Sequence, residues 1–184
     1  MHKYDFRFDE SLIRSFVGKI LKQYKCAEFL YTNSVTGILG IEIGDQVYGL
    51  INDYEPFDYM SLDDEATVFR FCKMNWIEIE SMVNNDINVM NVNEKIKKIV
   101  LVNDHTILKN FHNVEYDMWD TKAIIFYFEE YELCFVKQDC WFSQEIEIYK
   151  GYNLLNKTGN GKGILSDFDE SDLISVDRTF VEIG

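Results

Sequence analysis

The sequence has very few residues that would divide a chain into separate parts, with one proline, Pro56, and ten glycines among 184 residues. It contains no internal repeat and no linker-like stretch. Hydrophobic residues make up 47% of the chain and aromatic residues 15%, which is too apolar for an intrinsically disordered protein. A chain of this length buries roughly 70% of its unfolded surface and needs no disulfide or metal to form a core. We therefore expect residues 1–184 to form a single domain.

Positive charge is also scarce. The 18 lysine and arginine residues are outnumbered by 32 acidic residues, which gives a formal net charge of -14 and a sequence pI of about 4.5. Such a protein repels polyanions, so the charge argues against nucleic acid and against anionic membrane surfaces as partners. A basic protein is the partner that this charge favours.

Long hydrophobic runs are missing. The longest dense run, Ala123–Phe128, has six residues, whereas a membrane-spanning helix needs roughly 18 to 20. The N-terminus does not show a basic start followed by an apolar core, so no signal peptide is predicted and we expect a cytoplasmic protein. Lysine outnumbers arginine by 14 to 4 and there are three alanines, which indicates AT-rich coding DNA and favours a bacterial source.

Cysteine patterns typical of metal sites or disulfide frameworks are absent as well. The four cysteines are irregularly spaced within apolar stretches, and no two form a C-x-x-C pair: Cys26, Cys72, Cys134 and Cys140. This spacing predicts reduced thiols in a core. We expect no bound metal and no cofactor.

The hydrophobic pattern predicts an α+β fold, with a mainly antiparallel β-sheet meander, an N-terminal amphipathic helix and one or two further short helices. Apolar residues from Leu12 to Tyr24 recur every three or four positions, as on one face of a helix. Ser61 precedes a second helical spacing through Phe69, although Phe69-Arg70-Phe71 also alternates like a strand, so the state of residues 66–74 stays open.

Several short segments are predicted to be strands because they are rich in branched and aromatic residues. They are Ala27–Thr32, Gly37–Ile43, Val47–Ile51, Trp76–Glu80, Ile99–Val102, Ala123–Phe128, Tyr131–Val136, Cys140–Phe142, Glu145–Tyr149 and Val176–Ile183. Gly44-Asp45 and Glu129-Glu130 are predicted to be hairpin turns. The Asn-rich run from Asn84 to Asn93 is predicted to be a loop.

No complete catalytic motif is present, and the three histidines limit acid–base chemistry. Asp104-His105 follows a predicted strand, where the imidazole could meet Cys134 or Cys140 as a base beside a thiol. An enzyme of unknown reaction with a site near Asp104, His105 and a cysteine is therefore one alternative. A second alternative is an acidic mimic of nucleic acid that blocks a DNA-binding protein.

Negative charge and aromatic residues are concentrated between residues 115 and 149. This region has nine acids and two bases, so it supplies seven of the fourteen net negative charges. Aromatic residues among acids are typical of a surface that binds a basic partner, because the rings bury area and the charges steer approach. The predicted partner-binding residues are Asp117, Trp119, Glu130, Glu132, Asp139 and Trp141.

The general character of the chain, small, acidic, cytoplasmic and rich in tryptophan and tyrosine, is similar to that of the immunity proteins that neutralise bacterial toxins. The resemblance covers size and composition only. It implies a non-catalytic protein-binding domain that neutralises a basic partner such as a toxin.

Overall fold

The computed structural model describes residues 1–29, 32–59, 62–83, 86–110, 113–140, 142–161 and 173–184, and most of them lie in β-strands. Helical structure in this part of the chain is limited to short segments: α1 (Glu10–Arg14), α2 (Trp76–Met82) and the 3-10 turn η1 (Leu154–Lys157). The prediction of a mainly antiparallel β protein with few helices is therefore confirmed.

One sheet, called sheet A, has the strand order β12-β8-β9-β10-β11-β3. A further strand, β1, pairs in parallel with the half of β9 that β10 does not reach. The strands of sheet A are β1 (His2–Phe6), β3 (Ser34–Thr36), β8 (Lys98–Asn110), β9 (Asn113–Tyr127), β10 (Glu132–Lys137), β11 (Glu145–Gly151) and β12 (Leu173–Ile183).

The second sheet, sheet B, is antiparallel throughout, with the order β6-β5-β4-β2-β7. Its strands are β2 (Ile20–Ala27), β4 (Ile38–Ile43), β5 (Gln46–Tyr59), β6 (Leu62–Met74) and β7 (Ile87–Lys95). The predicted turn at Gly44-Asp45 joins β4 to β5, and Gly44 has a φ of 60°, which glycine adopts without strain.

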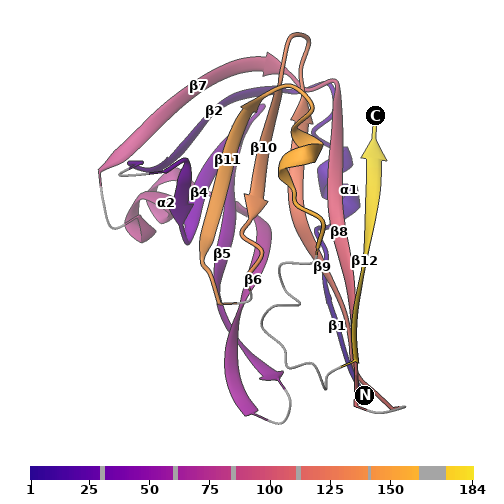
Figure 1. The fold of residues 1–184 in the computed structure, drawn as a ribbon. Coiled ribbons are helices and arrows are strands. Elements are labelled where there is room, and N and C mark those ends of the chain that lie inside the picture. Colours follow the sequence, from indigo (N-terminus) through magenta and orange to yellow (C-terminus); the bar gives the residue numbers. More distant parts are fainter. Residues whose placement is uncertain (30–31, 60–61, 84–85, 111–112, 141, 162–172) are drawn as a thin grey trace.

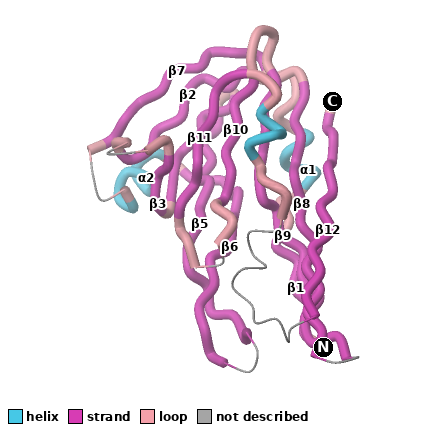
Figure 2. Tube along the Cα trace, viewed as in Figure 1, coloured by secondary structure: helices cyan, strands magenta, loops and turns pink. Residues whose placement is uncertain are grey.

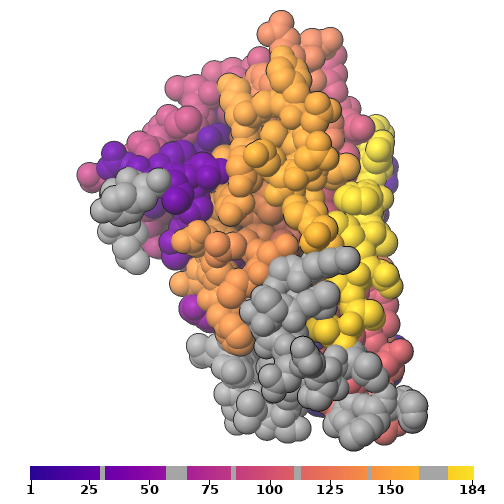
Figure 3. All heavy atoms as spheres, viewed as in Figure 1, coloured from indigo at the N-terminus to yellow at the C-terminus, as the bar shows by residue number. Residues whose placement is uncertain are grey.

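The two sheets face each other across one hydrophobic core, as Figures 1 and 2 show. Both sheets supply fully buried side chains, among them Leu39 and Leu50 from sheet B and Phe126 and Phe135 from sheet A. A smaller cluster, which includes Val102 and Cys134, lies on the opposite face of sheet A beneath η1, and Figure 3 shows the atoms of the η1 region, in light orange, on that face of the molecule. The four cysteines are free; Cys26 and Cys134 are buried as predicted, whereas Cys72 and Cys140 are only partly buried.

The predicted N-terminal amphipathic helix is wrong in extent. Helix α1 ends at Arg14, and the chain then turns at Gly18, whose φ is 83° and whose N–H donates to the carbonyl of Ile96. Strand β2 follows. A β-bulge between Leu21 and Gln23 shifts its alternation, so that buried residues fall three positions apart and imitate a helical spacing.

Two expectations of secondary structure in the middle of the chain are corrected. Strand β6 occupies Leu62–Met74, so the helical spacing after Ser61 does not form a helix and residues 66–74, whose state was open, are a strand. The helical spacing arises because four consecutive residues, 66–69, are all buried. Trp76–Glu80 begins helix α2 rather than a strand. Asn75 and Glu78 form a capping box, which fixes the start of that helix.

Helix α2 packs against sheet B where a glycine leaves room for it. A Cβ atom at Gly40 of β4 would lie 2.5 Å from the Trp76 ring and 2.6 Å from the Ile79 side chain. Ile79 is the buried residue of the helix, whereas the alternate residue Ile77 is exposed. The apolar and acidic alternation that predicted a strand therefore does not reflect alternate burial.

Three boundaries also differ from prediction. The Asn-rich segment predicted as a loop contains β7 from Ile87 onward, and Cys140 and Phe142 lie outside strands. Of the strand predicted over Ala27–Thr32, Ala27 is the last residue of β2, Glu28 and Phe29 lie outside strands, and residues 30–31 lie outside the described part of the chain. The predicted strands within β4, β5, β8, β9, β10, β11 and β12 are present, and β5, β8, β9 and β12 extend well beyond the predicted bounds. The hairpin turn at Glu129-Glu130 is also confirmed.

Candidate functional site

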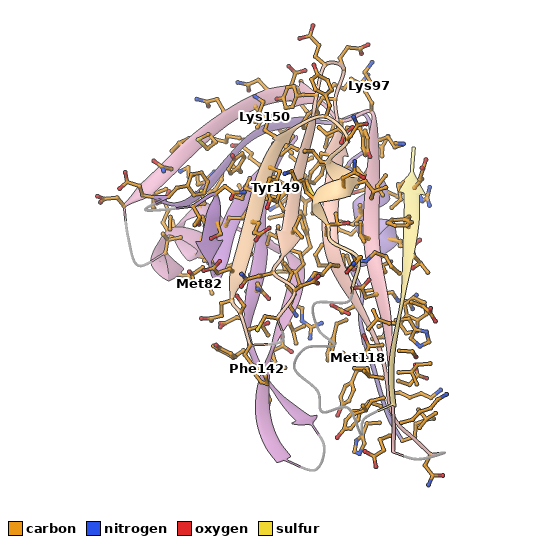
Figure 4. All side chains as sticks on the ribbon, viewed as in Figure 1. Met82, Lys97, Met118, Phe142, Tyr149 and Lys150 are labelled. Atoms are coloured by element: carbon orange, nitrogen blue, oxygen red, sulfur yellow. The ribbon has the colours of Figure 1, made fainter. Side chains whose placement is uncertain are left out.

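The predicted partner-binding residues that the structure describes are spread over different places: Asp117, Trp119 and Glu132 lie in strands of sheet A, and Glu130 and Asp139 lie in turns beside it. Glu130 is exposed in the turn between β9 and β10, whereas Glu132 begins β10. Glu132 accepts a hydrogen bond from the N–H of Leu154 at 2.7 Å and thereby holds η1. Figure 4 shows Lys97 and Lys150 at this end of the molecule.

Asp117 and Trp119 lie toward the opposite end, where β9 pairs with β1, and the neighbouring Met118 marks this place in Figure 4. Asp139 follows β10 and forms an ion pair in a separate cluster described below. Trp141 lies outside the described residues. The fold therefore brings Asp117 and Trp119 together and separates them from Glu130 and Glu132.

Trp119 is the centre of an open face formed by four strands. Its indole stacks on the His105 ring, with centroids 4.2 Å apart and an interplanar angle of 7°, while the Arg7 guanidinium lies 4.7 Å from the indole centroid. Strand pairing places Asp177 opposite His105 and Asp5 opposite Trp119. We call this surface the Trp119 face; it comprises Lys3, Asp5, Arg7, His105, Asp117, Trp119 and Asp177.

Hydrogen bonds and ion pairs hold these side chains in place. His105 Nε2 lies 2.8 Å from Asp117 Oδ1, Lys3 Nζ lies 3.4 Å from Asp117 Oδ2, and Arg7 Nη2 donates to Asp5 Oδ2 at 2.6 Å. The hydrogen bond from His105, assisted by Lys3, keeps the pKa of Asp117 below its ordinary value despite partial burial. A hollow of about 310 Å³ opens between β1 and β9, lined by Lys3, Tyr4, Asp5, Arg7, Asp117 and Trp119.

The opposite face of the same strands carries a buried charged cluster. The Arg178 guanidinium donates two hydrogen bonds to Asp104, from Nε to Oδ1 and from Nη2 to Oδ2, each 2.6 Å long. Its Nη1 donates to the carbonyls of Thr158 and Gly159. The side chains of Arg178 and Asp104 are only 9% and 4% exposed, so this bidentate pair is shielded from water.

Two lysines extend the cluster toward β10 and sheet B. Lys122, the extra residue in a β9 bulge, has its Nζ 2.5 Å from Asp139 Oδ1. Lys137 donates from Nζ to the carbonyl of Thr67 on β6 at 2.5 Å, which links the two sheets. Burial raises the pKa of Asp120, whose Oδ1 is inaccessible to solvent and has no hydrogen-bond partner. This cluster therefore joins five strands through charged groups with little access to water.

Replacing Lys137 with methionine is expected to change how stability depends on pH. Burial lowers the pKa of Lys137 from 10.5 to about 8, so between these values the unfolded chain holds a proton that the folded protein has released. The stability contributed by this group therefore rises with pH across that window, by about 3 kcal/mol at most.

Urea unfolding at several pH values measures this effect as the difference in stability between wild type and Lys137→Met. Buried thiols such as Cys26, whose pKa burial raises to about 11, have the opposite effect, but they are common to both proteins and cancel in the difference. The difference should rise in favour of wild type from pH 8 to 10.5. A difference in stability that stays constant over this range would show that burial does not lower the pKa of Lys137.

The residues of the alternative enzyme site are not brought together. Asp104 and His105 are neighbours in β8 and point to opposite faces, Asp104 toward Arg178 and His105 toward Asp117. Cys134 lies fully buried under η1, where burial raises the pKa of its thiol. His105 Nε2 is hydrogen-bonded to Asp117, and among the described residues no hydrogen bond joins His105 to Cys134 or to Cys140.

Sequence reasoning found Asp117 and Trp119 but missed the residues that position them. Arg7 directly follows β1 and His105 lies in β8, and no residue near Trp119 in the sequence indicates either contact. Over the residues that the structure describes, no group of three or more His, Cys, Asp or Glu side chains is arranged to hold a metal ion. The helices described are too short to cross a membrane.

Comparisons with protein-family models, with curated proteins and with solved structures gave no match. The geometry of the Trp119 face and the charge of the chain are therefore the basis for the function proposed next.

Proposed function

We propose that this protein is a non-catalytic binding domain that captures a basic protein on the Trp119 face, as an immunity protein captures a bacterial toxin, in the bacterial cytoplasm. The observation that carries the proposal is the fixed position of Trp119, between Arg7 and His105, on a sheet face rimmed by carboxylates. Tryptophan and arginine are the residues most often found at the energetic centre of protein interfaces.

The Trp119 face is organised before a partner arrives. Arg7 is tied to Asp5, and His105 is tied to Asp117, so the groups on both sides of the indole already have their hydrogen bonds. Binding to such a surface immobilises few additional rotamers, and the entropic cost of association is correspondingly small. The hollow beside Trp119 offers room for a side chain of the partner.

The negative charge of the protein favours a basic partner. The chain carries a net charge of -14, and Asp177 on the rim of the Trp119 face is exposed. A negative field accelerates the approach of a cationic protein and slows the approach of nucleic acid or an anionic membrane. A nuclease toxin fits this description, since its active site is itself cationic in order to hold nucleic acid.

Reversing the charge of Asp177 to lysine is expected to slow association with the partner by about tenfold at low ionic strength, and by much less at high salt, because salt screens exposed charges beyond about 10 Å at 0.1 M. Dissociation should change little. Stopped-flow or biosensor kinetics measure both rates, using the partner that wild type retains from cells after its identification by mass spectrometry.

The matched control is Asp45→Lys, which makes the same change in net charge at an exposed turn of sheet B. If the Trp119 face receives the partner, Asp45→Lys slows association less than Asp177→Lys does. Equal slowing by the two variants would mean that only the net charge matters and that the Trp119 face is not the contact surface.

A further inference from the structure

Exposed apolar side chains gather on α2 and β7, far from the Trp119 face. Ile77 on α2 is 81% exposed and Met82 is 42% exposed, while Val89 on β7, opposite Lys25, is 48% exposed. Met90 is 41% exposed and lies on the other face of β7, opposite Tyr24. An isolated exposed aliphatic residue is ordinary, but a group of them is typical of an interaction surface. Figure 1 shows β7 along the outer border of sheet B, with α2 beside the sheet.

Lys25 lies between β7 and α2 and connects them into one surface. It lies opposite Val89 in the pairing of β2 with β7, and its Nζ lies 4.3 Å from the Trp76 ring centroid and 2.7 Å from Glu80 Oε1. Helical spacing places Ile77 beside Glu80 on the same flank of α2. Val89, Lys25 and the exposed flank of α2 therefore form a continuous patch.

Strand β7 is an edge strand with little protection. Among the described strands it pairs only with β2. Its first five residues, Ile87–Asn91, contain no charge and no proline, and the bulge at Asn93, where φ is 54°, begins beyond them. Natural edge strands usually carry charges, prolines or bulges that prevent pairing with another chain. This stretch leaves a row of backbone donors and acceptors available.

The surroundings of this edge are negatively charged. Glu28 and Asp86 lie together at the start of β7, where the Glu28 N–H donates to the Asp86 carbonyl. Both are exposed, and within the described part of the chain neither is ion-paired. Lys25 is the cation at this place, and Glu80 neutralises it. A second copy of the chain would bring like charges together, whereas a basic segment would find complementary ones.

We propose that β7 and α2 form a second docking surface, on which an extended basic segment of the partner adds to sheet B as a further strand. Backbone hydrogen bonds to Ile87–Asn91 supply affinity, alternate side chains contact Val89 and Ile77, and cationic residues approach Glu28 and Asp86. The inference rests on the proposed function for the charge of the partner, and it uses a surface separate from Trp119.

The test uses a defined probe, a capped peptide of about seven residues that alternates lysine and valine, a length that matches the free edge. Its N-methylated counterpart cannot pair as a strand and serves as the control peptide. NMR titration of the full-length protein should shift the amide signals of Ile87–Asn91, with affinity that falls as salt is added. The N-methylated peptide should not cause these shifts.

The double variant Ile77→Ser, Val89→Lys should bind the peptide about tenfold more weakly, because it removes two apolar contacts and adds a cation to the edge. Phe180→Ser is the matched control, since Phe180 is 51% exposed on β12, an edge strand of sheet A. Failure of the Trp119 proposal is seen separately, in the association rates of Asp177→Lys and Asp45→Lys with the partner.

Three outcomes would overturn the inference: peptide shifts on β12 instead of β7, undiminished binding to the double variant, or no shift at any peptide concentration. Sedimentation velocity of wild type tests for a fourth such outcome. A dimer that the Val89→Lys change dissociates would assign this edge to a second copy of the chain instead of a basic segment.

Discussion

Replacing Arg178 with alanine should lower the free energy of unfolding by about 3 to 5 kcal/mol. The variant leaves the Asp104 carboxylate buried without its bidentate partner, and it leaves the carbonyls of Thr158 and Gly159 without the Nη1 donor. Burial of an uncompensated charge has a large cost because little water reaches the group. Urea unfolding of wild type and variant at neutral pH measures the loss.

Arg70→Ala is the matched control. Arg70 makes a comparable two-point contact with Glu55, at 2.9 and 2.7 Å, but both side chains are 41% exposed. Water and ions compensate an exposed pair, so this variant should lose about 1 kcal/mol or less. The double variant Arg178→Met, Asp104→Leu removes both charges and should recover most of the stability. Equal losses for Arg178→Ala and Arg70→Ala would show that the buried pair does not stabilise the fold through desolvation.

The parts of the fold that the sequence predicted well depend on local signals. The β9–β10 hairpin was predictable because two dense apolar runs flank Glu129-Glu130, and β4–β5 because Gly44 permits a positive φ. The wrong predictions of secondary structure arise where the spacing of apolar residues in the sequence imitates that of another element. A bulge in β2 gave Leu21 and Tyr24 a helical spacing. The capping box of Asn75 and Glu78 was the overlooked signal for α2.

The candidate sites were less predictable because they depend on pairing between distant strands. Asp117 and Trp119 could be found from their setting among acids, but Arg7 reaches Trp119 only through the parallel pairing of β1 with β9. Asp104 and Arg178 are 74 residues apart and meet because β12 pairs with β8. A single sequence contains turn and capping signals, but it does not specify which strands become neighbours.

Replacing Trp119 with alanine should weaken binding of the basic partner by about 2 kcal/mol or more, which corresponds to roughly thirtyfold in affinity. The indole supplies the apolar area at the centre of the Trp119 face, and its loss leaves Arg7 and His105 without the ring that aligns them. The effect should be a faster dissociation, because short-range contacts control the lifetime of a complex. The fold should persist, since the ring is partly exposed and lies outside the core between the sheets.

The most direct test of binding at the Trp119 face is the dissociation rate of the complex. It is measured on a biosensor for wild type, Trp119→Ala and Phe180→Ala. Phe180 is a matched control because it is an exposed aromatic residue on β12, opposite Val102, away from the Trp119 face. We expect dissociation about thirtyfold faster for Trp119→Ala and unchanged for Phe180→Ala. A wild-type rate for a folded Trp119→Ala protein would contradict the claim that this face binds the partner.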